Sequence, residues 1–94
     1  MTEKCWEISG RVQRVGFRYW VVLQAVKIGN LSGFAMNHPN GNVLVKAVGS
    51  EENLEKLYTI LHKGPLFSRV DSVIENPSLN TLFPPVENGY FKRI

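Results

Sequence analysis

The order of its apolar segments constrains the fold of this chain more than any other feature. Two stretches have the spacing of helices: one from Phe17 to Ile28, and one that starts at the N-cap residue Ser50 and runs to about His62. Four others favour strands: Cys5 to Ser9, Leu31 to Met36, Asn42 to Val48 and Ser68 to Ile74. With right-handed crossovers this order predicts an α+β protein, a βαββαβ sandwich in which two helices cover one face of a four-stranded antiparallel sheet.

The first predicted helix is apolar nearly all round. One face is expected in the core and carries Phe17, Val21, Gln24, Ala25 and Ile28. The opposite face carries Tyr19, Val22, Leu23 and Val26. We expect a monomer, and if this second face is exposed the alternative is a weak dimer formed through it.

Composition places the chain among ordinary globular proteins. Its 94 residues favour one domain over residues 1–94, with 44% apolar and 20% charged residues. The single Cys5 cannot form an intramolecular disulfide, and no apolar run is long enough to span a bilayer. No apolar segment follows Met1 as a signal peptide would require. We therefore expect a cytoplasmic protein that makes no contact with membranes.

A basic loop bracketed by Gly10 and Gly16 leads into the first predicted helix. Arg11, Arg14 and Arg18 crowd the start of that helix, where unpaired N–H groups already carry partial positive charge. Residues 8 to 50 contain five Lys or Arg and no Asp or Glu, so with a net charge of +3 the rest of the chain sums to −2. The compensating negative charge is therefore expected to come from a bound phosphate or carboxylate.

The same distribution argues against a metal. A Mg²⁺ site normally recruits carboxylates, and residues 8 to 50 have none. Cys5, His38 and His62 are too few for a structural zinc site. We expect no metal and no cofactor.

Two blocks of sequence carry a family resemblance. Gly-Arg-Val-Gln-x-Val-Gly-Phe-Arg opens the helix, and Gly33-Phe34 leads to Asn37 at a strand end. A hairpin and Gly41-x-Val43 follow. Over roughly residues 6 to 73 this pattern resembles the acylphosphatase family, which implies a ferredoxin-like fold.

The resemblance also implies a hydrolase, with catalytic residues Arg18 and Asn37. Such an enzyme would hydrolyse the carboxyl-phosphate bond of an acyl phosphate, giving a carboxylate and inorganic phosphate without a metal or cofactor. Arg18 would hold the phosphate together with the amides of a phosphate-binding loop, and Asn37 would position the attacking water. That loop comprises Gln13, Arg14, Val15, Gly16, Phe17 and Arg18. Because the leaving carboxylate is a weak base, positioning and charge stabilisation suffice.

The chain departs from the family pattern at several positions. Arg14 stands where the family usually has glycine, Met36 where a basic residue is common, and Asn40 where aspartate is common. There is also one extra residue near Asn30. Arg14 either strains the loop and narrows the phosphate site or adds another phosphate donor. After Asn76-Pro77 the chain is expected to be a loop as far as Pro84-Pro85, and residues 90 to 94 match the closing strand of the family only loosely.

Two other functions compete with the hydrolase. An RNA-binding module can share the βαββαβ plan, but it needs stacking aromatic residues on its central strands, and residues 42 to 49 contain none. A catalytically weakened domain that binds anions is the other alternative, with Arg14 as its cause. We expect no nucleic-acid partner.

Overall fold

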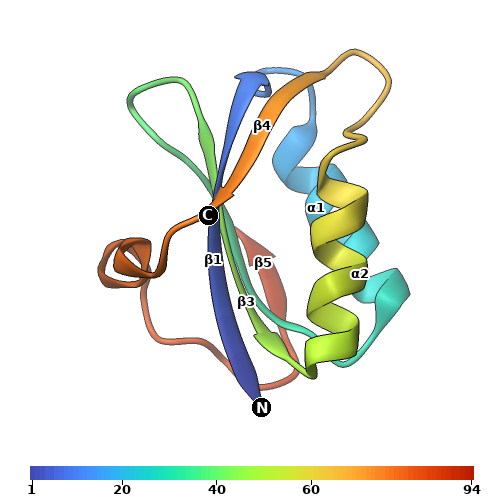
Figure 1. Cartoon of the computed structure of the whole chain (residues 1–94), viewed down its shortest axis with the longest axis vertical. Coiled ribbons are helices and arrows are strands. Elements are labelled where there is room, and N and C mark those ends of the chain that lie inside the picture. Colours follow the sequence, from blue (N-terminus) through green and yellow to red (C-terminus); the bar gives the residue numbers. More distant parts are fainter.

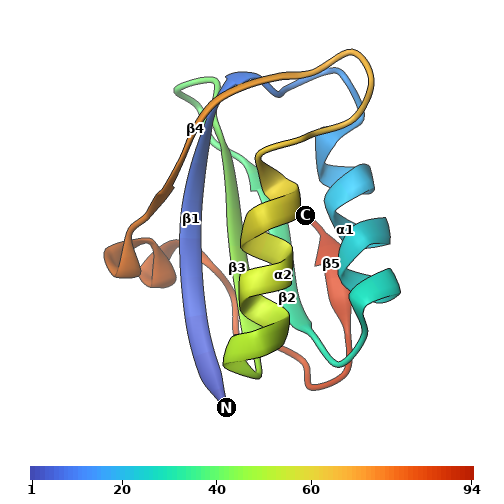
Figure 2. The same ribbon diagram turned by 45° about the vertical axis from the view of Figure 1, so that its right-hand side comes forward.

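A computed structural model, which describes all residues 1–94, contains one mixed sheet of five strands in the order β4-β1-β3-β2-β5 (Figure 1, edge-on; Figure 2, with all five strands labelled). The strands are β1 (Thr2–Arg11), β2 (Ser32–Asn37), β3 (Val43–Gly49), β4 (Arg69–Glu75) and β5 (Phe91–Arg93). The first four pair antiparallel, as predicted. The short β5 adds a fifth strand, parallel to β2, and so confirms a terminal strand that the sequence matched only loosely.

Two helices cover the same face of this sheet, which confirms the predicted α+β architecture (Figure 2). Helix α2 (Glu51–Leu61) has a side-chain cap, because the Ser50 hydroxyl accepts from the Asn53 N–H at 3.1 Å, and acidic residues occupy its first turn. Helix α1 (Phe17–Ile28) begins instead at Gly16, with no side-chain cap and no acidic residue in its first turn. The positive end of α1 is therefore left uncompensated by the chain.

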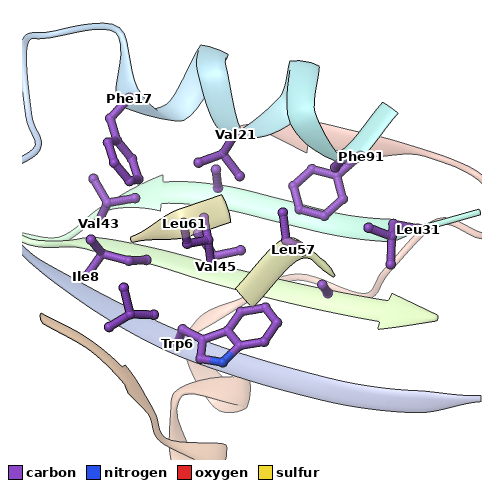
Figure 3. Packing of buried hydrophobic residues seen from close by; sticks show 14 of the residues in the cluster. Trp6, Ile8, Phe17, Val21, Leu31, Val43, Val45, Leu57, Leu61 and Phe91 are labelled. Carbon is purple, nitrogen blue, oxygen red and sulfur yellow. The ribbon is translucent and has the colours of Figure 1, made fainter. Parts of the chain in front are cut away.

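The main core lies between the helices and the sheet (Figure 3). Helix α1 buries Phe17, Val21 and Ala25, and Gln24 and Ile28 of the same predicted face are half-buried. Helix α2 contributes Leu54, Leu57 and Leu61, which pack with Trp6, Ile8, Val43 and Val45 of the sheet. Each fully buried large side chain stabilises the fold by roughly 1.5–3 kcal/mol, so this core holds α1 and its loop against the sheet.

A 3₁₀ helix, η1 (Pro77–Leu82), covers part of the opposite face of the sheet. The expectation of an unstructured loop here was wrong. The Asn76 side chain accepts from the Ser78 N–H at 3.2 Å and caps η1, and Pro77 fits its first position. Leu79 and Phe83 then pack on Cys5, Phe34 and Leu44 in a second, smaller apolar cluster.

The outer face of α1 is narrower than the sequence predicts. Leu23 and Val26 are exposed, as is Tyr19, but Val22 is half-buried and packs against the main core. The condition for a dimer through this face, that all four residues are exposed, is therefore not met at Val22. No helix of the chain combines the length and the apolar character needed to cross a membrane.

Candidate functional site

The loop between β1 and α1 has a backbone suited to binding an anion. Arg14 and Gly16 have positive φ angles of 63° and 77°. Gln13, which precedes Arg14, and Val15, which lies between the two, do not. Alternation of this kind turns successive N–H groups toward one concave side. None of the amides of Gln13, Arg14, Val15 and Gly16 donates a hydrogen bond within the chain. These donors are free to bind a ligand.

The start of α1 adds to this cradle. The Gly16 carbonyl accepts from the Trp20 N–H at 3.0 Å, so the helix begins directly after the loop. Residues 17 to 19 have no preceding helical turn to receive their N–H groups. Loop and helix end therefore direct a continuous set of amides and the positive end of a helix dipole to one place.

A pocket of about 160 Å³ lies at this loop. It is lined by Val12, Arg14, Gly16, Phe17, Arg18, Tyr19, Asn37 and Arg93. The half-buried Arg18 is held in place because its Nη1 donates to the Ile94 carbonyl oxygen at 2.8 Å. Asn37 lies at the end of β2, half-buried, and its carboxamide makes no hydrogen bond within the chain. The two residues expected to be catalytic thus share one pocket, and no Asp or Glu lines it.

The loop residues predicted to bind phosphate differ in where their side chains lie. Arg14, Gly16 and Phe17 line the pocket, although the Phe17 ring is also buried in the core. Val15 packs against the core as well. Val15 and Phe17 can therefore contact a ligand only through their backbone amides, whereas the exposed Arg14 can also use its side chain.

The side chain of Gln13 has a role that the sequence did not reveal. Its Nε2 donates to the carbonyl oxygens of His38, at 2.8 Å, and Asn42, at 2.9 Å. These carbonyls belong to the hairpin that directly follows Asn37. Gln13 therefore ties the predicted phosphate-binding loop to the hairpin that follows Asn37.

Three residues that line the pocket were not predicted from the sequence: Val12, Tyr19 and Arg93. Arg93 reaches the pocket because β5 pairs with β2 and sets it opposite Ala35. Its guanidinium carbon lies 5.8 Å from the centroid of the Tyr19 ring, within the range of a cation–π contact. The only signal in the sequence was the basic pair Lys92-Arg93. It could not be placed at the pocket without knowing that β5 pairs with β2.

The hairpin after Asn37 is also fixed from β1. The Glu7 carboxylate accepts from the side-chain amides of Asn42, at 2.6 Å, and Asn40, at 2.9 Å. The bond from Asn42, then that from Asn40, holds the pKa of Glu7 below its usual value, against the opposing effect of burial. Asn40, where the family commonly has aspartate, thus donates to a carboxylate that an aspartate would repel.

We expect the Glu7 network to stabilise the protein only when Glu7 is ionised. A depressed pKa contributes stability above the unfolded value of about 4.3, and this is lost as pH falls through the lower folded value. Glu7→Gln should lower Tm by a few degrees at pH 7, and the difference should shrink as the pH is lowered below the unfolded-state pKa of about 4.3. Thermal unfolding across this range measures it, and a difference that is independent of pH contradicts the assignment. Glu55→Gln, on the exposed side of α2, is the control.

Arg14 is expected to destabilise the fold. A left-handed backbone costs a non-glycine residue about 1–2 kcal/mol, of which the larger unfolded-state entropy of glycine offsets about 0.5–1 kcal/mol. Arg14→Gly should therefore raise the free energy of unfolding by roughly 0.5–1 kcal/mol. Arg14→Ala keeps a Cβ and should show no such gain. Urea unfolding of both variants measures the difference, and equal stability of the two would contradict the strain.

Comparison with known proteins agrees with this geometry. Residues 4–81 match the family model described as Acylphosphatase. The chain is 43% identical over 76 residues to the acylphosphatase of Nitratidesulfovibrio vulgaris (strain Hildenborough), covering 81% of this chain and 75% of that one. It is 49% identical over 67 residues to that of Mycobacterium sp. (strain KMS), covering 71% and 70%.

Comparison of the fold with solved structures indicates the same family. The crystal structure of acylphosphatase from Bacillus subtilis matches with a TM-score of 0.81 and 33% identity, covering 100% of this chain and 99% of that chain. The predicted resemblance is confirmed over most of the chain. The chain belongs to the acylphosphatase family of enzymes.

Proposed function

We propose that this pocket hydrolyses acyl phosphates, with Arg18 and the loop amides binding the phosphoryl group and Asn37 orienting the water. The observation that carries this proposal is the set of unpartnered loop amides beside Arg18 and Asn37 in one pocket. The guanidinium of Arg18 offers a planar pair of donors to two phosphoryl oxygens. Charge that develops on these oxygens in the transition state is then stabilised without any metal.

The reaction needs little acid or base assistance. Water attacks phosphorus as the bond from phosphorus to the acyl oxygen breaks, and the carboxylate leaves with the bonding electron pair. The carboxylic acid has a pKa near 4, so its oxygen leaves without being protonated. The Asn37 carbonyl accepts a hydrogen bond from the water, and the water's proton passes to a phosphoryl oxygen. Placement of water and phosphoryl group is then the main contribution of the protein.

Hydrolysis of benzoyl phosphate in EDTA tests this proposal. We expect equimolar benzoate and phosphate, with competitive inhibition by inorganic phosphate. Phosphate binding without hydrolysis would instead support the weakened anion-binding domain. RNA binding without hydrolysis would support the RNA-binding module, although η1 covers part of the sheet face that such modules use.

We propose that the enzyme is a monomer. With Val22 packed on the core and Tyr19 lining the pocket, only Leu23 and Val26 remain of the surface that would form a dimer. Two side chains bury far less area than a stable interface needs. Light scattering at increasing protein concentration should give a constant mass. A rising mass that Leu23→Glu abolishes would contradict this. The cytoplasmic location stays a prediction.

A further inference from the structure

We propose that this enzyme selects acyl phosphates whose acyl group carries a second negative charge, and that Arg14 and Arg93 recognise that charge. This inference rests on the proposed function, because it takes the phosphoryl group to be bound by Arg18 and the loop amides. It concerns the part of the pocket which that function leaves unused.

The charges in the pocket are not balanced by the phosphoryl group alone. Three arginines line it, Arg14, Arg18 and Arg93, and no Asp or Glu does. Arg14 and Arg93 form no ion pair and no side-chain hydrogen bond within the chain. A phosphoryl dianion facing Arg18, the loop amides and the end of α1 leaves these two cations without a partner. A second anion on the acyl group would supply one.

The backbone of Arg14 supports a function for its side chain. A non-glycine residue at φ 63° is uncommon, and such strain persists mainly where it serves a site. The glycine of the family pattern would adopt this conformation at no steric cost. Arg14 adopts the same conformation with backbone strain, and it adds a positively charged residue to the lining of the pocket.

Arg93 is positioned by backbone pairing and by one aromatic contact. It lies opposite Ala35 in the pairing of β5 with β2, and the following Ile94 N–H donates to the Ala35 carbonyl at 2.9 Å. The Tyr19 ring contacts its guanidinium group. Because β2 ends at Asn37, Arg93 is held two positions along the sheet from the proposed water-orienting residue.

The size of the pocket indicates where the second anion binds. A volume of about 160 Å³ leaves little room beyond a phosphoryl group and a few carbon atoms. Arg14 and Arg93 are both exposed, so their charged ends are available at the rim. A short acyl chain with a terminal anion, such as the monophosphorylated form of a small dicarboxylic acid, would bridge from Arg18 to this rim.

Succinyl phosphate and butyryl phosphate provide a matched pair of probes. Their acyl chains have the same number of carbon atoms, but only the first ends in a carboxylate. We expect kcat/KM to be about tenfold higher for succinyl phosphate, a ratio typical of one charge-assisted contact at a partly exposed site. Arg14→Gly and Arg93→Gln should each lower this ratio by roughly threefold or more. Arg14→Lys keeps the positive charge and should retain most of the succinyl-to-butyryl ratio. High salt should lower this ratio in the wild type.

Lys27→Gln, at the far end of α1, removes one positive charge outside the pocket and should leave the ratio unchanged. Circular dichroism of each variant shows that it is folded. Equal kcat/KM for the two substrates in the wild type overturns the inference. So does an equal loss for both substrates in the Arg14 and Arg93 variants, since these residues would then act on the phosphoryl group. If neither substrate is hydrolysed, the proposed function fails instead.

Discussion

Replacing Arg18 with alanine is expected to lower kcat/KM for benzoyl phosphate by about 10³-fold or more. An arginine that stabilises charge on a transferring phosphoryl group contributes on this scale. Inhibition by inorganic phosphate should be lost in parallel, because the same side chain would bind substrate and product. Arg18→Lys keeps the charge without the planar pair of donors and should recover only a small part of the activity.

Steady-state kinetics and phosphate inhibition measure these effects. Lys27→Ala removes a cation from the same helix but outside the pocket, and its activity should equal that of the wild type. Since Arg18 contacts Ile94 near β5, the melting temperature of Arg18→Ala must be measured as well. A folded Arg18→Ala enzyme with nearly full activity would contradict the proposed role.

Replacing Asn37 with alanine should reduce kcat by about 10²–10³-fold, the range associated with correct placement of an attacking group. The binding of phosphate should change little, because Arg18 and the loop amides remain. Stability should also change by less than about 0.5 kcal/mol, because the carboxamide makes no hydrogen bond within the chain. A fall in kcat with KM nearly unchanged separates this role from that of Arg18.

Asn88→Ala is the matched control, since Asn88 is exposed and does not line the pocket. Titration of each variant with inorganic phosphate isolates binding from turnover. If Asn37→Ala lost phosphate affinity and kcat together, the residue would be part of the phosphate cradle and would not act chiefly on water.

Local sequence was sufficient for most of the fold. The buried face of α1 recurs at the spacing of Phe17, Val21 and Ala25, and α2 combines the Ser50 cap with a regular leucine stripe, so both helices were predicted from neighbouring residues alone. The same holds for the glycine-bracketed loop. Its phosphate-binding role, and the roles of Arg18 and Asn37, stay predictions until the variants are measured.

Features that depend on distant contacts could not be predicted in this way. The side chain of Gln13 bonds to carbonyls 25 and 29 residues away, and Arg93 reaches the pocket only through the pairing of β5 with β2. Helix η1 is stabilised because Leu79 and the following Phe83 pack against Phe34 and Leu44 of the sheet. The burial of Val22 was left open for a related reason: on a helix that is apolar all round, an apolar residue does not show which neighbours will cover it.

Strand β5 also affects how the protein avoids self-association. It occupies the backbone hydrogen-bonding groups on one side of β2, which would otherwise form an open sheet edge. A bare edge of this kind is a template for intermolecular strand pairing and aggregation. The other edge, β4, carries the exposed charges of Arg69, Asp71 and Glu75, which discourage such pairing. A mutation that detached β5 would therefore be expected to impair solubility and substrate selection together.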